Sequence, residues 1–329
     1  MSRGILQWLT TEHFPPLTGA TQWINTSPLT PDALRGKVVL VNFWTYTCIN
    51  WLRTLPYISA WAEKYKDHGL VVLGVHTPEF AFEHNIGNVQ RAMVRLGVTY
   101  PVAIDNKYAI WNAFANHYWP ALYFVDAEGN IRYSQFGEGE YEMAERVIQE
   151  LLVEAGAGKI DDSLVSVDPE GVTAPADWLE LQSPETYLNY DRLTGFGSPG
   201  GVVPGVPHDY QAVEPLRLNQ WALEGKWTVD EAAVMSDGAG ARILFRFHAR
   251  DVNLVMGPLM RGIPLEFTVR LDGKPPNEAH GDDVNAGGKG VLTEQRLYQL
   301  VRQRVPVEDC LFGIEFVQAG AQALAFTFG

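Results

Sequence analysis

Cys48 is the residue of this sequence best placed to do chemistry. It lies in "VNFWTYTCINWLRTLPY", residues 41–57, between an apolar run typical of a strand and a pattern typical of an amphipathic helix. A cysteine that begins a helix lies at the positive end of the helix dipole, beside backbone N–H groups without helical partners, and both favour the thiolate. We therefore expect a nucleophile at neutral pH. The alternative is an inert cysteine that packs as a small hydrophobic residue.

Position 51, where a dithiol redox motif has its second thiol, is occupied by a tryptophan. Trp51 either shields the sulfur and narrows access to it, or fills the vacated space by packing against Trp44 or Trp119. The ten tryptophans of the chain favour packing, because aromatic residues bury readily. In both cases an internal disulfide with Cys48 is excluded at this spacing.

Composition limits the classes of function. The chain has 329 residues, 46% of them hydrophobic, which is enough for two domains with their own cores. A net charge of −14 argues against nucleic acid or an anionic membrane as the main partner. Two cysteines cannot build a disulfide framework, and no apolar run is long enough to span a membrane. We expect a cytoplasmic protein.

The first part of the chain alternates between strand and helix patterns. This alternation over residues 38–156 predicts parallel β-α-β units, and a hairpin at residues 121–136 adds antiparallel strands before a closing helix at 141–156. We therefore predict an α/β domain with a mixed sheet over residues 1–156. Residues 157–182 have little periodicity and several Pro, Gly and Asp, which is typical of a linker.

The remaining residues, 183–329, have the pattern of an all-β domain. Hydrophobic and polar residues alternate in "ARILFRF", "LEFTVRLDG", "CLFGIEFVQ" and "ALAFTFG", and turn residues separate these segments. This pattern predicts a β-sandwich or jelly roll. Neither part shows histidine or acidic residues at the spacing of a metal site, and we predict no metal and no other cofactor.

Several motifs in the first 155 residues resemble the thioredoxin superfamily, and more closely its redoxin branch of TlpA/ResA type. They are "VVLVNFW" before the cysteine, Pro56 eight residues after it, and "WPALYFVDAEGNIR". The resemblance implies a thioredoxin-like fold in which Trp119–Pro120 is the cis-proline step that faces the reactive sulfur. It also implies that Glu79, in "VHTPEF", is an acid near the active site, where a carboxylate can donate or accept a proton.

Thr45 resembles the threonine of the peroxiredoxin Thr-x-x-Cys motif, because it lies three residues before Cys48. Its hydroxyl is then able to hydrogen-bond a thiolate or a peroxide oxygen. The proline of that motif is absent, since residue 41 is valine, and threonine is common at strand ends in any case.

A narrower resemblance extends over nearly the whole chain. The segments "TYTCIN", "RTLPY", "SPETYLNYDR" and "AFTFG" are similar to the soluble portion of DipZ-type proteins. In those proteins a thioredoxin-like domain precedes a β-rich domain, so the resemblance implies a jelly roll like a carbohydrate-binding module at residues 183–329.

Two classes of function follow. The first is an oxidoreductase in which Cys48 exchanges disulfides, or reduces peroxides through a sulfenic acid, with a small thiol or a thiol protein as reductant. The second is a binding or adaptor protein whose β domain recognises a saccharide or a protein. A cluster of exposed Trp or Tyr on residues 183–329 would favour the second.

Overall fold

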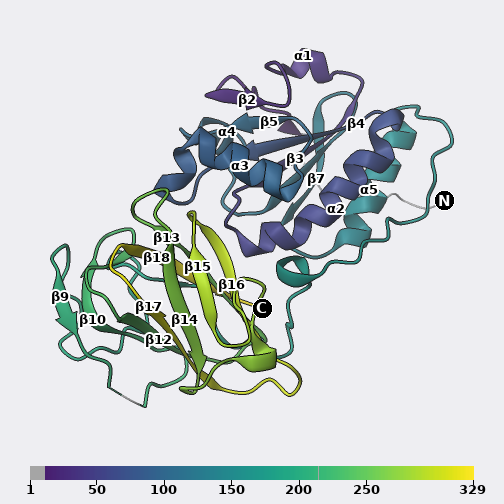
Figure 1. The fold of residues 1–329 in the computed structure, drawn as a ribbon. Helices are drawn as coiled ribbons and strands as arrows, with labels where there is room; N and C mark the ends of the chain where they lie inside the picture. Colours follow the sequence, from purple (N-terminus) through teal and green to yellow (C-terminus); the bar gives the residue numbers. More distant parts are fainter. Residues whose placement is uncertain (1–11, 214) are drawn as a thin grey trace. The chain divides into compact units, whose positions relative to one another are not determined.

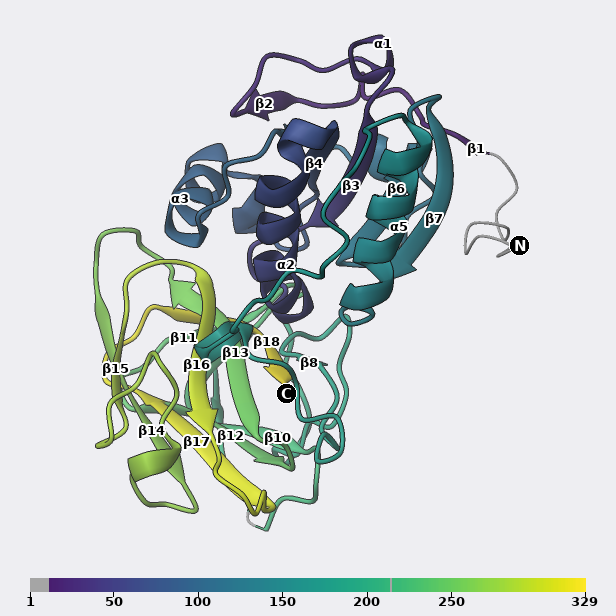
Figure 2. The ribbon, with the colours of Figure 1, turned by 90° about the vertical axis from the view of Figure 1, so that its right-hand side faces the viewer.

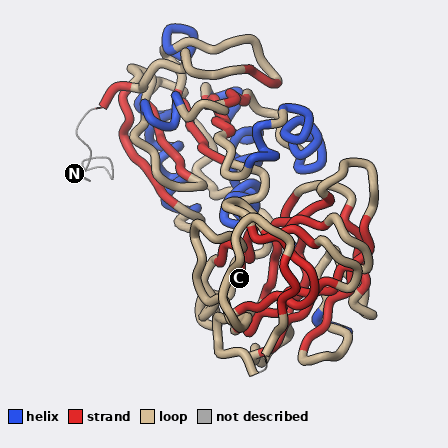
Figure 3. The backbone as a smooth tube through the Cα atoms, turned by 90° about the vertical axis from the view of Figure 1, so that its left-hand side faces the viewer, coloured by secondary structure: helices blue, strands red, loops and turns tan. Residues whose placement is uncertain are grey.

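The computed structural model describes residues 12–213 and 215–329, which divide into two compact units between Thr173 and Ala174. This boundary falls inside the predicted linker, residues 157–182. Helices belong almost entirely to the first unit (Figure 3). The second unit consists of strands and loops, apart from the short 3₁₀ turn η4 (Asn277–Ala279).

The first unit is built on a seven-stranded mixed sheet in the order β1-β7-β6-β3-β4-β5-β2. β3 runs parallel to β4, and β4 to β5, whereas the remaining neighbours are antiparallel. The mixed α/β prediction is therefore confirmed. The strands are β1 (Glu12–His13), β2 (Gln22–Ile24), β3 (Val38–Trp44), β4 (Leu70–His76), β5 (Val102–Ile104), β6 (Ala121–Val125) and β7 (Asn130–Phe136).

Helices cover both faces of this sheet. Three of them, α2 (Ile49–Tyr65), α3 (Ile86–Leu96) and α5 (Tyr141–Glu154), lie side by side on one face (Figure 2). The short helices α1 (Pro31–Leu34) and α4 (Ala109–Ala113) contribute to a separate hydrophobic core with alternate residues of β3. The 3₁₀ turns of this unit are η1 (Lys66–His68), η2 (Ala81–His84) and η3 (Gly171–Thr173).

β3 and α2 together position the cysteine. All seven residues of β3 are buried, because the strand is central and helices cover both of its faces. The start of α2 is buried on all sides, since residues 51–55 are all buried, whereas farther along the buried residues recur every three or four positions, as in Ile58, Trp61 and Tyr65, so that part presents one side to the sheet. Cys48 therefore lies in the turn between a buried central strand and a helix that packs on the sheet.

Part of the predicted linker packs on the first unit. The Val165 N–H donates to both carboxylate oxygens of Glu145, at 3.0 and 2.9 Å, and Glu145 on α5 is 1% exposed. Lys64 of α2 donates to the Ser163 carbonyl oxygen. Residues 163–165 are thus part of the folded unit.

The second unit is a large antiparallel β domain (Figure 1). Its main path has the order β15-β14-β17-β12-β10-β11-β18-β13-β16, with β8 beside β18 and β9 beside β10. The strands are β8 (Thr186–Tyr187), β9 (His208–Tyr210), β10 (Trp221–Val229), β11 (Val234–Ser236), β12 (Ala241–Phe247), β13 (Asp251–Pro258), β14 (Leu265–Leu271), β15 (Lys289–Leu292), β16 (Arg296–Arg302), β17 (Cys310–Phe316) and β18 (Ala321–Phe328).

β10 joins the two halves of this sheet. Its residues up to Glu224 pair with β12, whereas those from Trp227 pair with β11. Between them Gly225 has φ +87°, a conformation that glycine adopts without steric cost, and it lets the strand turn a corner. The halves enclose one core that includes Trp221, Trp227 and Phe245. The all-β prediction is confirmed, and the jelly-roll assignment stays a prediction.

Within the described ranges, the structure contains no helix with the length and apolar character needed to cross a bilayer.

Candidate active site

Cys48 is the N-cap residue of α2 and is half-buried. Its sulfur lies 3.6 Å from the carbonyl oxygen of Trp119, to which the thiol can donate. The Trp119–Pro120 peptide bond is cis, as predicted. Strand β3, helix α2 and the loop before β6 therefore converge on one sulfur atom.

Trp51 is fully buried and stacks on Trp44. The ring centroids are 4.4 Å apart and the ring planes differ by 23°. Gly74 on the neighbouring strand β4 makes room for this pair, because a Cβ atom there would lie 2.8 Å from Nε1 of Trp44. Of the two explanations for Trp51, the structure therefore shows packing, against Trp44 rather than Trp119.

Trp119 is held by contacts of its own. Its indole N–H donates to the carbonyl oxygen of Thr77 at 3.1 Å, and its ring lies 4.3 Å from that of Trp111. The Trp119 ring is thus held by the segment that follows β4, through Thr77, and by α4, through Trp111. These two contacts position the carbonyl group that faces Cys48.

The carboxylate that contacts the cysteine loop belongs to Glu83. It accepts from the hydroxyl of Thr47 at 2.6 Å and from the backbone N–H groups of Glu79 and Phe80 at 2.7 and 2.9 Å. Thr47 is the residue directly before Cys48. Glu83 therefore ties the cysteine loop to the segment that follows β4.

Glu83 is completely buried, which raises the pKa of its carboxyl group, while its hydrogen bonds oppose that shift. Sequence reasoning singled out Glu79, but that side chain is only half-buried, and the Glu79 backbone is what binds Glu83. The role predicted for Glu79 stays a prediction. The sequence does contain a signal for Glu83, because it is the second acid of "PEFAFE". In the structure it lies in the 3₁₀ turn η2.

Thr45 is fully buried. Its hydroxyl has no hydrogen-bond partner among the described residues. The backbone of Thr45 accepts from the Cys48 N–H at 3.3 Å. The Thr45 carbonyl group therefore helps to hold the backbone turn that carries Cys48.

His76 is buried between aromatic rings at the end of β4. Its ring lies 4.9 Å from that of Trp44 and 5.9 Å from that of Tyr46. Burial lowers its pKa to about 3, because the charged imidazolium would be cut off from water. His76 is thus neutral at physiological pH.

A buried ion pair supports α2 one turn beyond the cysteine. Nη1 of Arg53 lies 2.8 Å from Oε1 of Glu138, and the two side chains are 2% and 6% exposed. Burial raises the pKa of Glu138, and the charge of Arg53 acts in the opposite direction. No local sequence pattern predicts this pair, because its members are 85 residues apart in the chain.

Cys310, the second cysteine, lies in the core of the second unit. Its side chain is buried at the start of β17, and burial raises the pKa of its thiol to about 12. Cys48 is thus the cysteine whose position suits chemistry.

Comparisons with known proteins agree with this geometry. Residues 14–152 match the Redoxin family, and residues 183–329 match the family described as thioredoxin like C-terminal domain. Protein DipZ of Mycobacterium tuberculosis is 41% identical over 266 residues, which are 79% of this chain and 36% of DipZ. The chain thus spans about a third of the length of that relative.

Two smaller proteins are each similar to less than half of this chain. Thiol-disulfide oxidoreductase YkuV of Bacillus subtilis is 29% identical over 140 residues, which are 43% of this chain and 94% of YkuV. A solution structure of a thioredoxin-like protein in the oxidized form is 30% identical, covers 44% of this chain and 97% of that one, and has a TM-score of 0.41.

The fold and the Redoxin match together identify the first unit as redoxin-type and thioredoxin-like. More particularly, the chain resembles the soluble part of DipZ.

Proposed function

We propose that this protein is a thiol-disulfide oxidoreductase in which Cys48 is the single nucleophile. The observation that carries the proposal is the position of Cys48: it begins α2, it is half-buried rather than enclosed, and its sulfur faces the carbonyl group of Trp119. The helix start favours the thiolate, which is the species that attacks disulfides. The name of YkuV, a thiol-disulfide oxidoreductase to which this chain is similar, supports this assignment.

The reaction proceeds through a mixed disulfide. The Cys48 thiolate attacks one sulfur of a substrate disulfide, so that one S–S bond forms while the substrate bond breaks, and the leaving thiolate takes a proton from water. A second thiol then attacks the mixed disulfide and restores Cys48. Because Trp51 occupies the place of a resolving cysteine, this second thiol comes from a separate molecule, either a small thiol or a thiol protein.

Exchange is better supported than peroxide reduction. A peroxidase of the Thr-x-x-Cys kind needs the Thr45 hydroxyl beside the bound peroxide. Here the Thr45 side chain is completely buried, and its hydroxyl is not exposed to a peroxide that enters from solvent.

The enzyme is also better supported than the saccharide-binding alternative. Saccharides commonly stack on exposed aromatic rings, as other ligands with apolar faces do. Among the described residues of 183–329, the most exposed aromatic side chain is Tyr190, at 38%, while Trp221 and Trp227 are buried. The aromatic cluster that would favour saccharide binding is not formed.

The proposal is tested with a glutathionylated peptide and reduced glutathione as the second thiol. We expect the wild type to release the peptide thiol catalytically and to show a mixed disulfide at Cys48 by mass spectrometry. Cys48→Ser should be inactive, and Cys310→Ser, the matched control, should retain full activity. Equal rates for the wild type and Cys48→Ser would overturn the proposal.

A further inference from the structure

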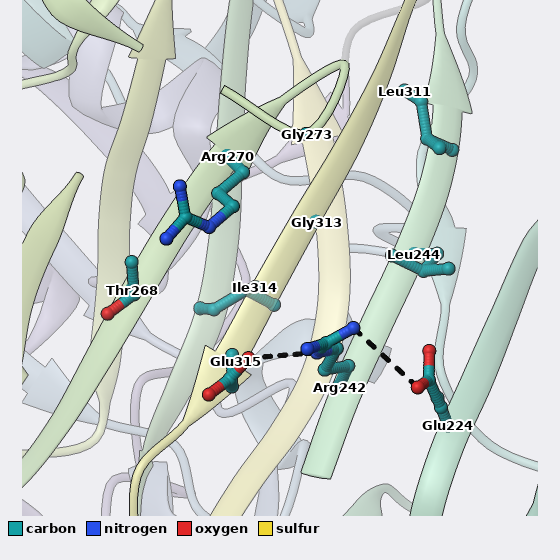
Figure 4. Close-up of a pocket in the computed structure, with 10 residues that line it drawn as sticks. All are labelled: Glu224, Arg242, Leu244, Thr268, Arg270, Gly273, Leu311, Gly313, Ile314 and Glu315. Atoms are coloured by element: carbon teal, nitrogen blue, oxygen red, sulfur yellow. Dashed lines mark hydrogen bonds and ion pairs between the residues drawn. The ribbon is translucent and has the colours of Figure 1, made fainter. Parts of the chain in front are cut away.

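A groove of about 330 Å³ lies on the second unit, on the face of the sheet opposite its core. It runs over β14, β17 and β12, where alternate residues face away from the core because side chains in a strand alternate between the two faces (Figure 4). The function proposed above does not use this groove.

Gly313 forms the middle of the groove. It pairs with Arg270 on β14 and with Leu244 on β12, so it lies between these two residues across the sheet. A Cβ atom at position 313 would lie 3.1 Å from Cδ2 of Leu244. The lack of a side chain thus leaves the hollow open, with Leu244 and Leu311 as apolar lining.

The two arginines of the groove, Arg242 and Arg270, differ in how many carboxylate partners they have. Arg242 lies 2.8 Å from Glu315 and 3.6 Å from Glu224, so two carboxylates surround one guanidinium (Figure 4). Arg270, on the other side of Gly313, forms no ion pair with any residue of the described ranges. Arg270 is therefore the cation of the groove that has no carboxylate partner among the described residues.

We infer that this groove binds a small monocarboxylate with a short aliphatic body. The carboxylate pairs with Arg270, whose planar guanidinium can donate two parallel hydrogen bonds. The aliphatic part lies over Gly313 against Leu244 and Leu311, where it is removed from water. Thr268, which precedes Arg270 by two residues on the same face, adds a hydroxyl donor.

The same charges disfavour a dianion such as phosphate. The two arginines and two glutamates that line the groove have no net formal charge. Glu315 and Glu224 therefore repel a second negative charge at close range. A single carboxylate satisfies Arg270 without that repulsion.

The test uses the full chain and three probes: hexanoate, 1-hexanol and inorganic phosphate. Binding is followed by NMR shifts of the backbone amides of Gly313, Thr268 and Leu244. We expect hexanoate to bind with millimolar affinity, and both 1-hexanol and phosphate to bind at least about tenfold more weakly. The reason is that 1-hexanol lacks the carboxylate and phosphate lacks the aliphatic chain.

Three variants separate the contributions. Arg270→Gln should weaken hexanoate binding by about tenfold, the effect of losing one charge-assisted contact. Gly313→Val should weaken it similarly by filling the hollow, with its melting temperature as the check on folding. Arg261→Gln, at an exposed arginine outside the groove, should bind as the wild type does.

Three results would overturn the inference. They are the absence of hexanoate shifts at the groove amides, equal affinity of Arg270→Gln and the wild type, and binding of 1-hexanol or phosphate as tight as that of hexanoate.

Discussion

The rings of Trp44, at the end of β3, and Trp51, in the first turn of α2, stack with their centroids 4.4 Å apart, and both are completely buried. The second indole stands where a dithiol redoxin has its second sulfur. The pair therefore does two things at once: it fills the core under the cysteine, and it removes the internal partner that would resolve a mixed disulfide.

Replacing Trp51 by cysteine should restore an internal disulfide at the cost of stability. Thiols three residues apart at the start of a helix can approach to bonding distance. Loss of a buried indole costs about 3–5 kcal/mol through the cavity it leaves. Mass spectrometry of oxidised Trp51→Cys should show the loss of two hydrogens, and denaturant unfolding should show the lower stability. Trp51→Phe, which keeps a ring but adds no thiol, is the control, and an oxidised Trp51→Cys that retains two thiols would contradict the placement of residue 51.

The hydrogen bond from Thr47 to Glu83 should control the reactivity of Cys48. Thr47→Val preserves shape but leaves a buried carboxylate oxygen without its donor, a loss of about 1–3 kcal/mol. Because Thr47 precedes Cys48 directly, we expect the rate of disulfide exchange to fall as well. Thr47→Ser keeps the hydroxyl and should rescue both properties. Stability loss without any change in exchange rate would show that the contact is structural only.

The two cysteines should differ sharply in alkylation. In the native protein at neutral pH, iodoacetamide should modify Cys48 and leave Cys310 intact, because Cys310 is buried and its pKa is raised to about 12. Peptide mapping before and after unfolding in urea measures this. Modification of Cys310 at a comparable rate in the native state would show that the core of the second unit opens readily.

His248 should make the second unit more stable in mild acid. Its Nδ1 lies 2.6 Å from Asp309 and its Nε2 lies 3.2 Å from Glu180. Burial acts to lower its pKa, but these two carboxylates outweigh that effect and raise it above 6.5. The folded state thus binds the proton more tightly than the unfolded state does. The resulting stability is present below pH 6.5 and is lost as the pH rises through the folded pKa.

The measurement is the NMR titration of the His248 ring proton, whose midpoint should lie above 6.5 in the wild type and fall in Asp309→Asn. His248→Gln should cost more stability below that pH than above it. A wild-type midpoint below 6.5 is the contrary result.

The sequence predicted the alternating strands and helices of residues 38–156, because buried strands and amphipathic helices have strong periodic signals, but it did not predict the short elements β1, β2 and α1. Cys48 at the start of α2 and the cis bond before Pro120 were both expected. Glu83 was not, since its function as a hydrogen-bond acceptor depends on the 3₁₀ turn that directs two backbone N–H groups toward it. The ion pair of Arg53 and Glu138 was equally out of reach, because no local pattern joins residues so far apart.

In the second unit the alternating strands were recognisable, but their order was not. The path of β10 through both halves of the sheet depends on Gly225 at one corner, and pairing across such a corner leaves no periodic trace. The groove is a similar case. Gly313 and Arg270 line one groove only because β14 and β17 pair side by side, and the sequence does not show that pairing.

The contact between Val165 and Glu145 bears on how the first unit can be cut out of the chain. The Redoxin match ends at residue 152, yet Glu145 depends on Val165 for two of its hydrogen bonds and shares its carboxylate with Tyr65, at 2.6 Å. A fragment that stops at 152 exposes this carboxylate and the side of α5 that carries it. A fragment that continues to Thr173 keeps them covered. The piece of chain recognised by similarity is therefore shorter than the compact unit to which it belongs.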